Sequence, residues 1–185
     1  MKLIILDRDG VINHDSDEFI KSPEEWLPID GSLKAISRLH RNGYRVVVIT
    51  NQSGIARGLF DIDKLNRIHQ KMMHEVQENG GQIDSVLFCP HGPDDGCNCR
   101  KPKTGMYEEL AERLQVKLNG VIAVGDSERD LVSARAVGAQ PVLVKTGKGM
   151  RTLASADPAS LEDVPVYDDL EAAVEAILQD ELELQ

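Results

Sequence analysis

Five short runs of apolar, largely β-branched residues divide the chain, and helical patterns separate them. The runs are KLIIL (2–6), YRVVVIT (44–50), SVLFC (85–89), GVIAVG (120–125) and PVLVKT (141–146). Because the apolar residues are nearly continuous, both faces of each strand are expected to be buried, as in a parallel sheet. The intervening helices then act as right-handed crossovers. The sequence therefore predicts an α/β fold, a Rossmann-like three-layer sandwich built around a mainly parallel sheet.

The helical patterns lie at 32–43, 61–81, 106–115 and 127–138, and the end of the chain predicts one more short strand and a closing helix over 164–179. Between Asp9 and Thr50 there is room only for a loop, one helix and one strand, and between Ser53 and Cys89 only for one helix and one strand. No separate cap domain is therefore expected. We predict a single domain spanning 1–185, with a frayed tail from about residue 180.

The formal net charge of −10 disfavours a general nucleic-acid-binding surface, so an anionic substrate would need locally placed cations. The N-terminal apolar run is too short for a signal peptide, and no stretch is long enough to span a membrane. We expect a cytoplasmic protein without a nucleic-acid or membrane partner, and a monomer.

Polar residues end each apolar run, and in a parallel sheet these ends meet at one edge, where ligands bind. Asp7 and Asp9 follow the first strand and Asp126 follows the fourth, so the three could share Mg²⁺. Taken alone, an Asp-x-Asp pair is more often a turn. The segment TNQSG (50–54) suits binding of an oxyanion but also suits an ordinary polar loop, and the pair Arg100 and Lys101 could face either phosphate or solvent.

The segment CPHGPDDGCNC (89–99) contains all three cysteines and predicts a second metal site. Cys89, His91, Cys97 and Cys99 supply four ligands for a closed tetrahedral Zn²⁺ site, although free thiols and a surface histidine are the alternative. Its role would be structural, because such a site fixes the loop 89–104 immediately before Arg100 and Lys101.

Together, DRDGV, TN, the basic pair and VGDSERD resemble the haloacid dehalogenase-like phosphatase superfamily, over residues 3 to about 148. The resemblance implies that Asp7 is the nucleophile and forms an aspartyl-phosphate, and that Asp9 is the general acid and base. It also implies that Thr50, Arg100 and Lys101 stabilise the transferring phosphoryl group. Mg²⁺ would be held by the Asp7 side chain, the Asp9 main-chain carbonyl and Asp126.

Within that superfamily, the zinc loop running into CRKPKTGM is similar to the D-glycero-D-manno-heptose 1,7-bisphosphate 7-phosphatases of lipopolysaccharide precursor synthesis. This similarity implies a phosphorylated sugar substrate. It assigns substrate binding to Arg8, Asp15, Ser16, Asp17, Glu18, Asn51, Gln52 and Ser53. Histidinol-phosphate phosphatase is the alternative substrate class, and a receiver-like signalling domain is the alternative of another kind.

Several polar residues are less clearly assigned by the sequence. A lysine often follows the motif aspartate in the subfamily, but here that residue is Ser127, so the preferred anomer is left open. Asp130 suits either a role beside the metal or a helix cap, and Lys103 suits either substrate or solvent. We expect His40, His69 and His74 on helix surfaces.

Overall fold

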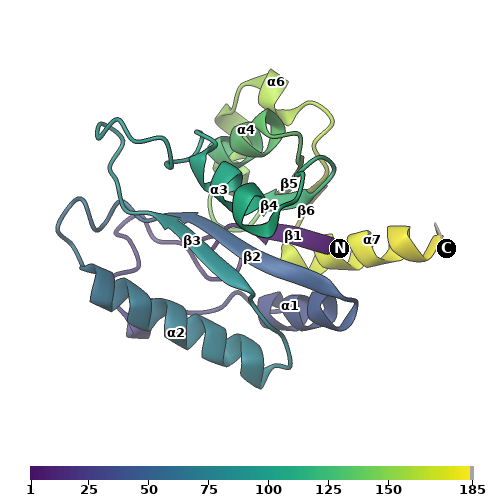
Figure 1. The fold of residues 1–185 in the computed structure, drawn as a ribbon, viewed down its shortest axis with the longest axis horizontal. Helices are drawn as coiled ribbons and strands as arrows, with labels where there is room; N and C mark the ends of the chain where they lie inside the picture. The colour runs from purple at the N-terminus through teal and green to yellow at the C-terminus, as the bar shows by residue number, and fades with distance from the viewer. Residues whose placement is uncertain (184–185) are drawn as a thin grey trace.

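The computed structural model describes residues 1–183, with side chains to Asp180, and its strands form one six-stranded parallel sheet (Figure 1). The sheet order is β3-β2-β1-β4-β5-β6. The strands are β1 (Lys2–Leu6), β2 (Tyr44–Asn51), β3 (Ser85–Cys89), β4 (Ile122–Gly125), β5 (Gln140–Val144) and β6 (Val166–Tyr167). The predicted α/β fold with a parallel sheet is confirmed.

Helices cover both faces of the sheet and form the outer layers of the sandwich. In Figure 1, α1, α2 and α7 lie on one face, while α3 and α4 lie on the other. The helices are α1 (Ser32–Arg41), α2 (Ile62–Glu78), α3 (Gly105–Leu114), α4 (Glu128–Ala136), α5 (Gly149–Ser155), α6 (Pro158–Leu161) and α7 (Leu170–Glu183), with a 3₁₀ turn, η1 (Pro23–Glu25).

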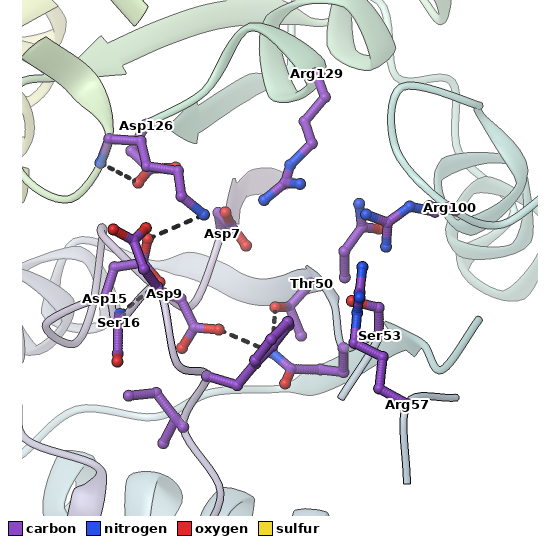
Figure 2. A pocket seen from close by; sticks show the side chains of 16 residues that line it. Asp7, Asp9, Asp15, Ser16, Thr50, Ser53, Arg57, Arg100, Asp126 and Arg129 are labelled. Atoms are coloured by element: carbon purple, nitrogen blue, oxygen red, sulfur yellow. Dashed lines mark hydrogen bonds and ion pairs between the residues drawn. The ribbon is translucent and has the colours of Figure 1, made fainter. Parts of the chain in front are cut away.

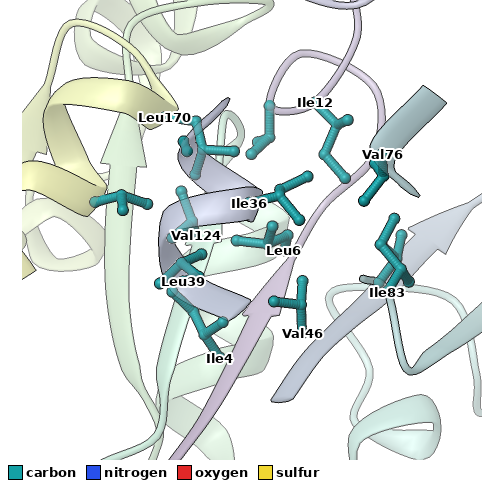
Figure 3. Packing of buried hydrophobic residues seen from close by; sticks show 14 of the residues in the cluster. Ile4, Leu6, Ile12, Ile36, Leu39, Val46, Val76, Ile83, Val124 and Leu170 are labelled. Carbon is teal, nitrogen blue, oxygen red and sulfur yellow. The ribbon is translucent and has the colours of Figure 1, made fainter. Parts of the chain in front are cut away.

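Alternate residues of the central strands enter two separate apolar cores, as the pleat of a strand requires. Ile4 and Leu6 of β1 pack in the core under α1, α2 and α7, part of which Figure 3 shows. Leu3 and Ile5 of the same strand point the other way and pack with residues of α3 and α4. Burial on both faces explains why these strands are continuously apolar.

The described residues add elements that the apolar pattern does not predict, namely η1, α5 and α6. Between β1 and β2 lie only a loop with η1 and the helix α1, and between β2 and β3 lies only the helix α2. No described segment forms a cap unit at either place. Helix α7 continues through Glu183, and the last two residues of the predicted frayed tail lie outside the described residues.

No helix among residues 1–183 is long and apolar enough to cross a membrane.

Candidate active site

Asp7 directly follows β1, the strand that lies between β2 and β4, so its carboxylate stands at the centre of the carboxyl edge of the sheet. Its backbone N–H donates to the carbonyl of Val124 on β4 at 2.9 Å. A polar cavity of about 220 Å³ opens at this edge (Figure 2). Its lining residues are Asp7, Asp9, Asp15, Ser16, Asp17, Phe19, Ile20, Thr50, Asn51, Gln52, Ser53, Arg57, Arg100, Asp126, Arg129 and Lys148.

A buried lysine holds Asp7 beneath the cavity. Lys101 is 2% exposed, and its Nζ lies 3.1 Å from Asp7 Oδ1 and 2.6 Å from Asp130 Oδ1. Burial opposes the charge of Lys101, yet Asp130 and Asp7 together raise its pKa. Burial raises the pKa of Asp7 to about 6, because the attraction of Lys101 offsets only part of the desolvation and Asp130 adds repulsion. At neutral pH, Asp7 is therefore mainly an anion, the form that a nucleophile requires.

Asp126 follows β4 and is packed against two glycines. Its Oδ2 accepts a hydrogen bond from the backbone N–H of Lys148 at 2.7 Å. A Cβ atom on Gly10 or Gly147 would lie 2.0 or 2.2 Å from this oxygen, and both glycines have positive φ. The pKa of Asp126 is raised to about 8, mainly by burial and further by the negative charges of Asp130 and Asp7. The carboxylate is thus held in a place where it lacks positive charge.

Three buried carboxylates, those of Asp7, Asp126 and Asp130, offer oxygens that lie within 4.8 Å of one another. Asp130 is already engaged, because its Oδ2 accepts from the Ser127 N–H at 3.0 Å and the Ser127 hydroxyl at 2.6 Å, while Oδ1 contacts Lys101. Asp130 is thus a helix cap and a partner of the lysine. Asp7 and Asp126 are left to face each other, and two hard oxygen ligands with raised pKa values fit Mg²⁺.

Asp9 is held by three neighbouring side chains. Arg8 donates to Oδ1 from Nε at 2.9 Å and to Oδ2 from Nη2 at 3.1 Å. Asn13 donates to Oδ1 at 2.8 Å, and Gln52 donates to Oδ2 at 3.0 Å. Burial favours the neutral acid, but the charge and hydrogen bonds of Arg8 outweigh it and lower the pKa of Asp9. Without substrate, Asp9 is therefore ionised.

The residues at and after the end of β2 contact both the cavity and the zinc loop. Gln52 also donates to the Thr50 hydroxyl at 3.0 Å, which fixes that hydroxyl at the cavity wall. The Asn51 amide pairs with the backbone of Lys101 in both directions, donating to its carbonyl and accepting from its N–H at 3.0 Å each. Ser53 is buried and lines the cavity.

Three guanidinium groups form one wall of the cavity, on the side opposite Asp15 and Ser16 (Figure 2). They belong to Arg57, Arg100 and Arg129, and none of the three forms an ion pair with a carboxylate of the described side chains. Burial and then the charge of Arg129 lower the pKa of Arg100. We call this set the arginine wall. The sequence did not predict a role for Arg57 or Arg129, although Arg129 lies within the VGDSERD motif.

The opposite wall comes from the loop after β1. Asp15 pairs with Lys148 at 3.2 Å, and Asp17 forms a two-pronged pair with Arg151 of α5 at 3.1 and 2.9 Å. Asp15, Ser16 and Asp17 line the cavity as predicted substrate contacts should, and Phe19 lines it with φ at 67°. Lys148 was also missed, because nothing in TGKGM marks it before the fold is known.

Three expected positions need correction. The Arg8 side chain is completely buried and turned away from the cavity, because Asp9 and His69 take its N–H groups, so its guanidinium does not meet a phosphate there. Glu18 is exposed and lies outside the cavity lining. His69 is buried at 7% exposure, rather than on the surface of α2.

The four predicted zinc ligands converge in the loop after β3. The Cys89 Sγ atom lies 3.6 Å from His91 Nδ1 and 3.7 Å from Cys97 Sγ, while Cys99 Sγ lies 3.0 Å from Cys89 Sγ and 3.2 Å from His91 Nδ1. Ligands around tetrahedral zinc are separated by about 3.5–3.8 Å, so the cluster fits Zn²⁺ with a small expansion around Cys99. Lys103 donates to the Cys97 carbonyl instead of entering the cavity.

Comparison with known proteins agrees with this geometry. A model of the HAD-hydrolase-like family matches residues 98–173. The D-glycero-β-D-manno-heptose-1,7-bisphosphate 7-phosphatase of Bordetella bronchiseptica is 55% identical over 97% of this chain and 99% of its own. The enzyme of the same name from Pseudomonas aeruginosa is 54% identical over 96% and 98%.

Two solved structures extend the comparison. The crystal structure of the D,D-heptose 1,7-bisphosphate phosphatase from B. bronchiseptica, complexed with magnesium and phosphate, superposes with a TM-score of 0.93 at 55% identity over 97% of this chain and 99% of the other. The corresponding enzyme from Burkholderia thailandensis gives a TM-score of 0.75 at 44% identity, with 96% and 99% covered.

The parallel sheet, the carboxylates at its centre and the buried lysine that joins them define a haloacid dehalogenase-like hydrolase. A receiver-like signalling domain is thereby set aside. Within this class, the chain belongs to the family of D-glycero-β-D-manno-heptose-1,7-bisphosphate 7-phosphatases.

Proposed function

We propose that this protein removes the 7-phosphate of D-glycero-β-D-manno-heptose 1,7-bisphosphate, in the synthesis of the nucleotide-activated heptose used for lipopolysaccharide. The observation that carries the proposal is the position of Asp7, a buried carboxylate at the base of a polar cavity that also holds the arginine wall. The β anomer is taken from the names of the relatives.

In the first step, an oxygen of Asp7 attacks phosphorus and the bond from phosphorus to the sugar oxygen breaks. The sugar oxygen takes a proton from Asp9 and leaves as an alcohol, and the phosphoryl group stays on Asp7 as an aspartyl-phosphate. In the second step, Asp9 accepts a proton from a water molecule that attacks this phosphorus. Inorganic phosphate leaves and Asp7 is regenerated.

The two steps need opposite forms of Asp9. Its lowered pKa suits the second step, in which the ionised carboxylate acts as a base. Entry of a phosphate group places a second negative charge nearby, which raises the pKa of Asp9 and favours uptake of the proton needed in the first step.

Bound Mg²⁺ would reduce the repulsion between Asp7 and the entering phosphate and polarise the phosphoryl oxygens. Asp7 and Asp126 would hold it through their side chains, and the main-chain carbonyl of Asp9 is the third proposed ligand. Thr50 and Arg100 line the cavity and would donate to the oxygens of the phosphoryl group. The ammonium of Lys101 already contacts Asp7, Asp130 and the carbonyl of Ile49, so Lys101 would stabilise the phosphoryl group through its positive charge. Zn²⁺ would fix the loop 89–104, which carries Arg100 and Lys101.

The arginine wall favours a bisphosphate over histidinol phosphate. A bisphosphate brings a second anionic group, which Arg57 and Arg129, the two guanidiniums of the wall that are not assigned to the transferring phosphoryl group, can bind in place of solvent. Histidinol phosphate instead carries an ammonium group at its other end. That group would be repelled by the same wall.

Specificity constants test the substrate assignment. We expect kcat/KM to be highest on the β anomer of heptose 1,7-bisphosphate, lower on the α anomer and fructose 1,6-bisphosphate, and lowest on histidinol phosphate. Arg129→Gln should raise KM for the bisphosphate by roughly tenfold, the loss of one charged hydrogen bond, while leaving p-nitrophenyl phosphate little changed. A preference for histidinol phosphate would reject the proposal.

The same proposal includes a cytoplasmic location and a monomeric state. The excess of acidic residues supports a monomer, because a large net charge makes copies of the protein repel one another. Sedimentation at several protein concentrations tests the monomer, since a mass that doubles with concentration would contradict it.

A further inference from the structure

Arg8 is a charged side chain with no access to solvent, and each of the nitrogens on its guanidinium has a partner in the protein. Nε and Nη2 donate to the two oxygens of Asp9, as described above. Nη1 lies 3.1 Å from Nε2 of His69, a residue of α2 that is 61 positions away in the chain. The side chain therefore links the catalytic edge of the sheet to the interior of α2.

The contact fixes the chemical state of His69. A guanidinium can only donate hydrogen bonds, so Nε2 of His69 must accept, and the ring must be neutral with its proton on Nδ1. Phe88 of β3 lies beside the imidazole, with ring centroids 6.1 Å apart. Burial, with Arg8 adding repulsion, lowers the pKa of His69 to about 3, which agrees with this state.

A fork of two parallel hydrogen bonds restricts how the Asp9 carboxylate can rotate, provided that the guanidinium itself stays in place. Asn13 and Gln52 each hold one oxygen of Asp9, whereas the Arg8 fork holds both and sets the plane of the carboxylate. Without a further contact, the guanidinium could tilt and turn that plane with it. The contact of Nη1 with His69, on a helix packed in the core, restricts this tilt of the guanidinium. Proton transfer requires donor and acceptor atoms about 2.6–3.2 Å apart, so a small swing would be enough to slow it.

We infer that His69 is a positioning residue for the proposed proton transfer by Asp9, acting through Arg8. The inference rests on the proposed function, because it assumes that Asp9 moves the proton. It assigns to Arg8 an internal role in place of contact with the substrate phosphate.

Two variants of His69 isolate the acceptor. In His69→Gln the amide oxygen can occupy the place of Nε2 and accept from Arg8, while His69→Phe keeps an aromatic side chain beside Phe88 but removes the acceptor. Each is compared with the wild type by kcat/KM, which reports the steps up to release of the alcohol, on two substrates. Heptose bisphosphate has an alkoxide leaving group that needs a proton, whereas p-nitrophenyl phosphate has a phenolate that leaves without one.

We expect His69→Phe to lower kcat/KM on the sugar by at least about tenfold, a fraction of the usual contribution of general acid catalysis. On p-nitrophenyl phosphate it should fall by no more than about twofold, and His69→Gln should stay close to the wild type on both substrates. Equal losses of His69→Phe on the two substrates would mean that His69 only supports the fold, and would overturn the inference. A loss in His69→Gln as large as in His69→Phe would also overturn it.

Asp9→Asn separates this inference from the proposed function. If that variant loses activity equally on both substrates, the assignment of Asp9 as general acid fails, whatever His69 does. If Asp9→Asn discriminates between the substrates and His69→Phe does not, only the role of His69 fails. Should His69→Phe not fold, Arg8→Lys, which keeps the charge but cannot form the fork, takes its place with the same expected discrimination.

Discussion

Gly10 allows the sharpest test of the proposed metal site, because a methyl group placed there meets the Asp126 carboxylate first and the backbone of Gly147 next. An ideal Cβ at Gly10 would lie 2.0 Å from Asp126 Oδ2 and 2.6 Å from its Cγ, whereas ordinary contact begins at 3.4 Å. The carboxylate would have to retreat by at least about 1.4 Å. Its oxygen accepts from the backbone N–H of Lys148, so retreat breaks the hydrogen bond that holds this carboxylate facing Asp7.

Gly10→Ala also carries a backbone cost, which a matched variant can remove from the comparison. Gly10 has φ of 84° and Gly43 has φ of 79°, but nothing lies within 4 Å of a Cβ at Gly43. Alanine in this left-handed region costs about 1–2 kcal/mol at either position. For a chain of this size, that lowers Tm by about 2–8 °C.

We therefore expect both variants to melt earlier, and only Gly10→Ala to lose function. A displacement of about 1 Å in a catalytic group can cost about 100-fold in rate, which is the loss in kcat/KM expected for Gly10→Ala. The Mg²⁺ concentration for half-maximal activity should also rise. The assay is a Mg²⁺ titration of phosphate release below each variant's melting range, and equal activity of the two alanine variants at every Mg²⁺ concentration would refute the reasoning.

Three further predictions address the nucleophile, the zinc loop and the buried histidine. Asp7→Asn should lower kcat by several orders of magnitude with Tm retained, whereas the same change at exposed Asp168 should leave kcat unchanged; substantial turnover by Asp7→Asn would show that another group attacks phosphorus. Metal analysis should find about one zinc per chain. Cys97→Ser should lower both the zinc content and kcat/KM by roughly 10-fold or more, because the loop would no longer hold Arg100 and Lys101 in place. Full activity without zinc would contradict this role. His69 stays neutral in the folded protein, but in the unfolded chain it binds a proton below its ordinary pKa of 6.5. The free energy of unfolding should therefore fall as the pH drops from 6.5 toward 3, and it should fall less steeply in His69→Gln. Parallel curves of unfolding free energy against pH for the two proteins would disprove the assignment.

The fold was predictable because its pattern is local. Each strand is marked by a short apolar run, and burial on both faces follows from the absence of alternation. The zinc ligands were predictable for a similar reason, since Cys89, His91, Cys97 and Cys99 lie within eleven consecutive positions and can be recognised by ligand type alone.

Groups whose role depends on distant partners were less accessible. A charge between two aspartates suggests contact with phosphate, but the buried guanidinium of Arg8 instead contacts His69, which α2 brings from 61 positions away. The spacing in α2 did contain a usable pattern, because His69 falls between Leu65 and Met72 on the buried stripe of the helix. The direction in which the Arg57 and Arg129 side chains point depends on how the loop after β2 and the first turn of α4 pack at the sheet edge, which no local pattern specifies.

The central place of β1 in the sheet also constrains how the chain can assemble during its synthesis. Residues 2–6 leave the ribosome before both of their partner strands, because Ile4 pairs on one side with Val46 and on the other with Ile122. This strand therefore keeps an open edge until β4 at Ile122 has followed, and such an edge can pair with other chains. A prematurely terminated product ending before β4 would contain the nucleophile without Asp126, and would be exposed to aggregation before it could ever act on a phosphate ester.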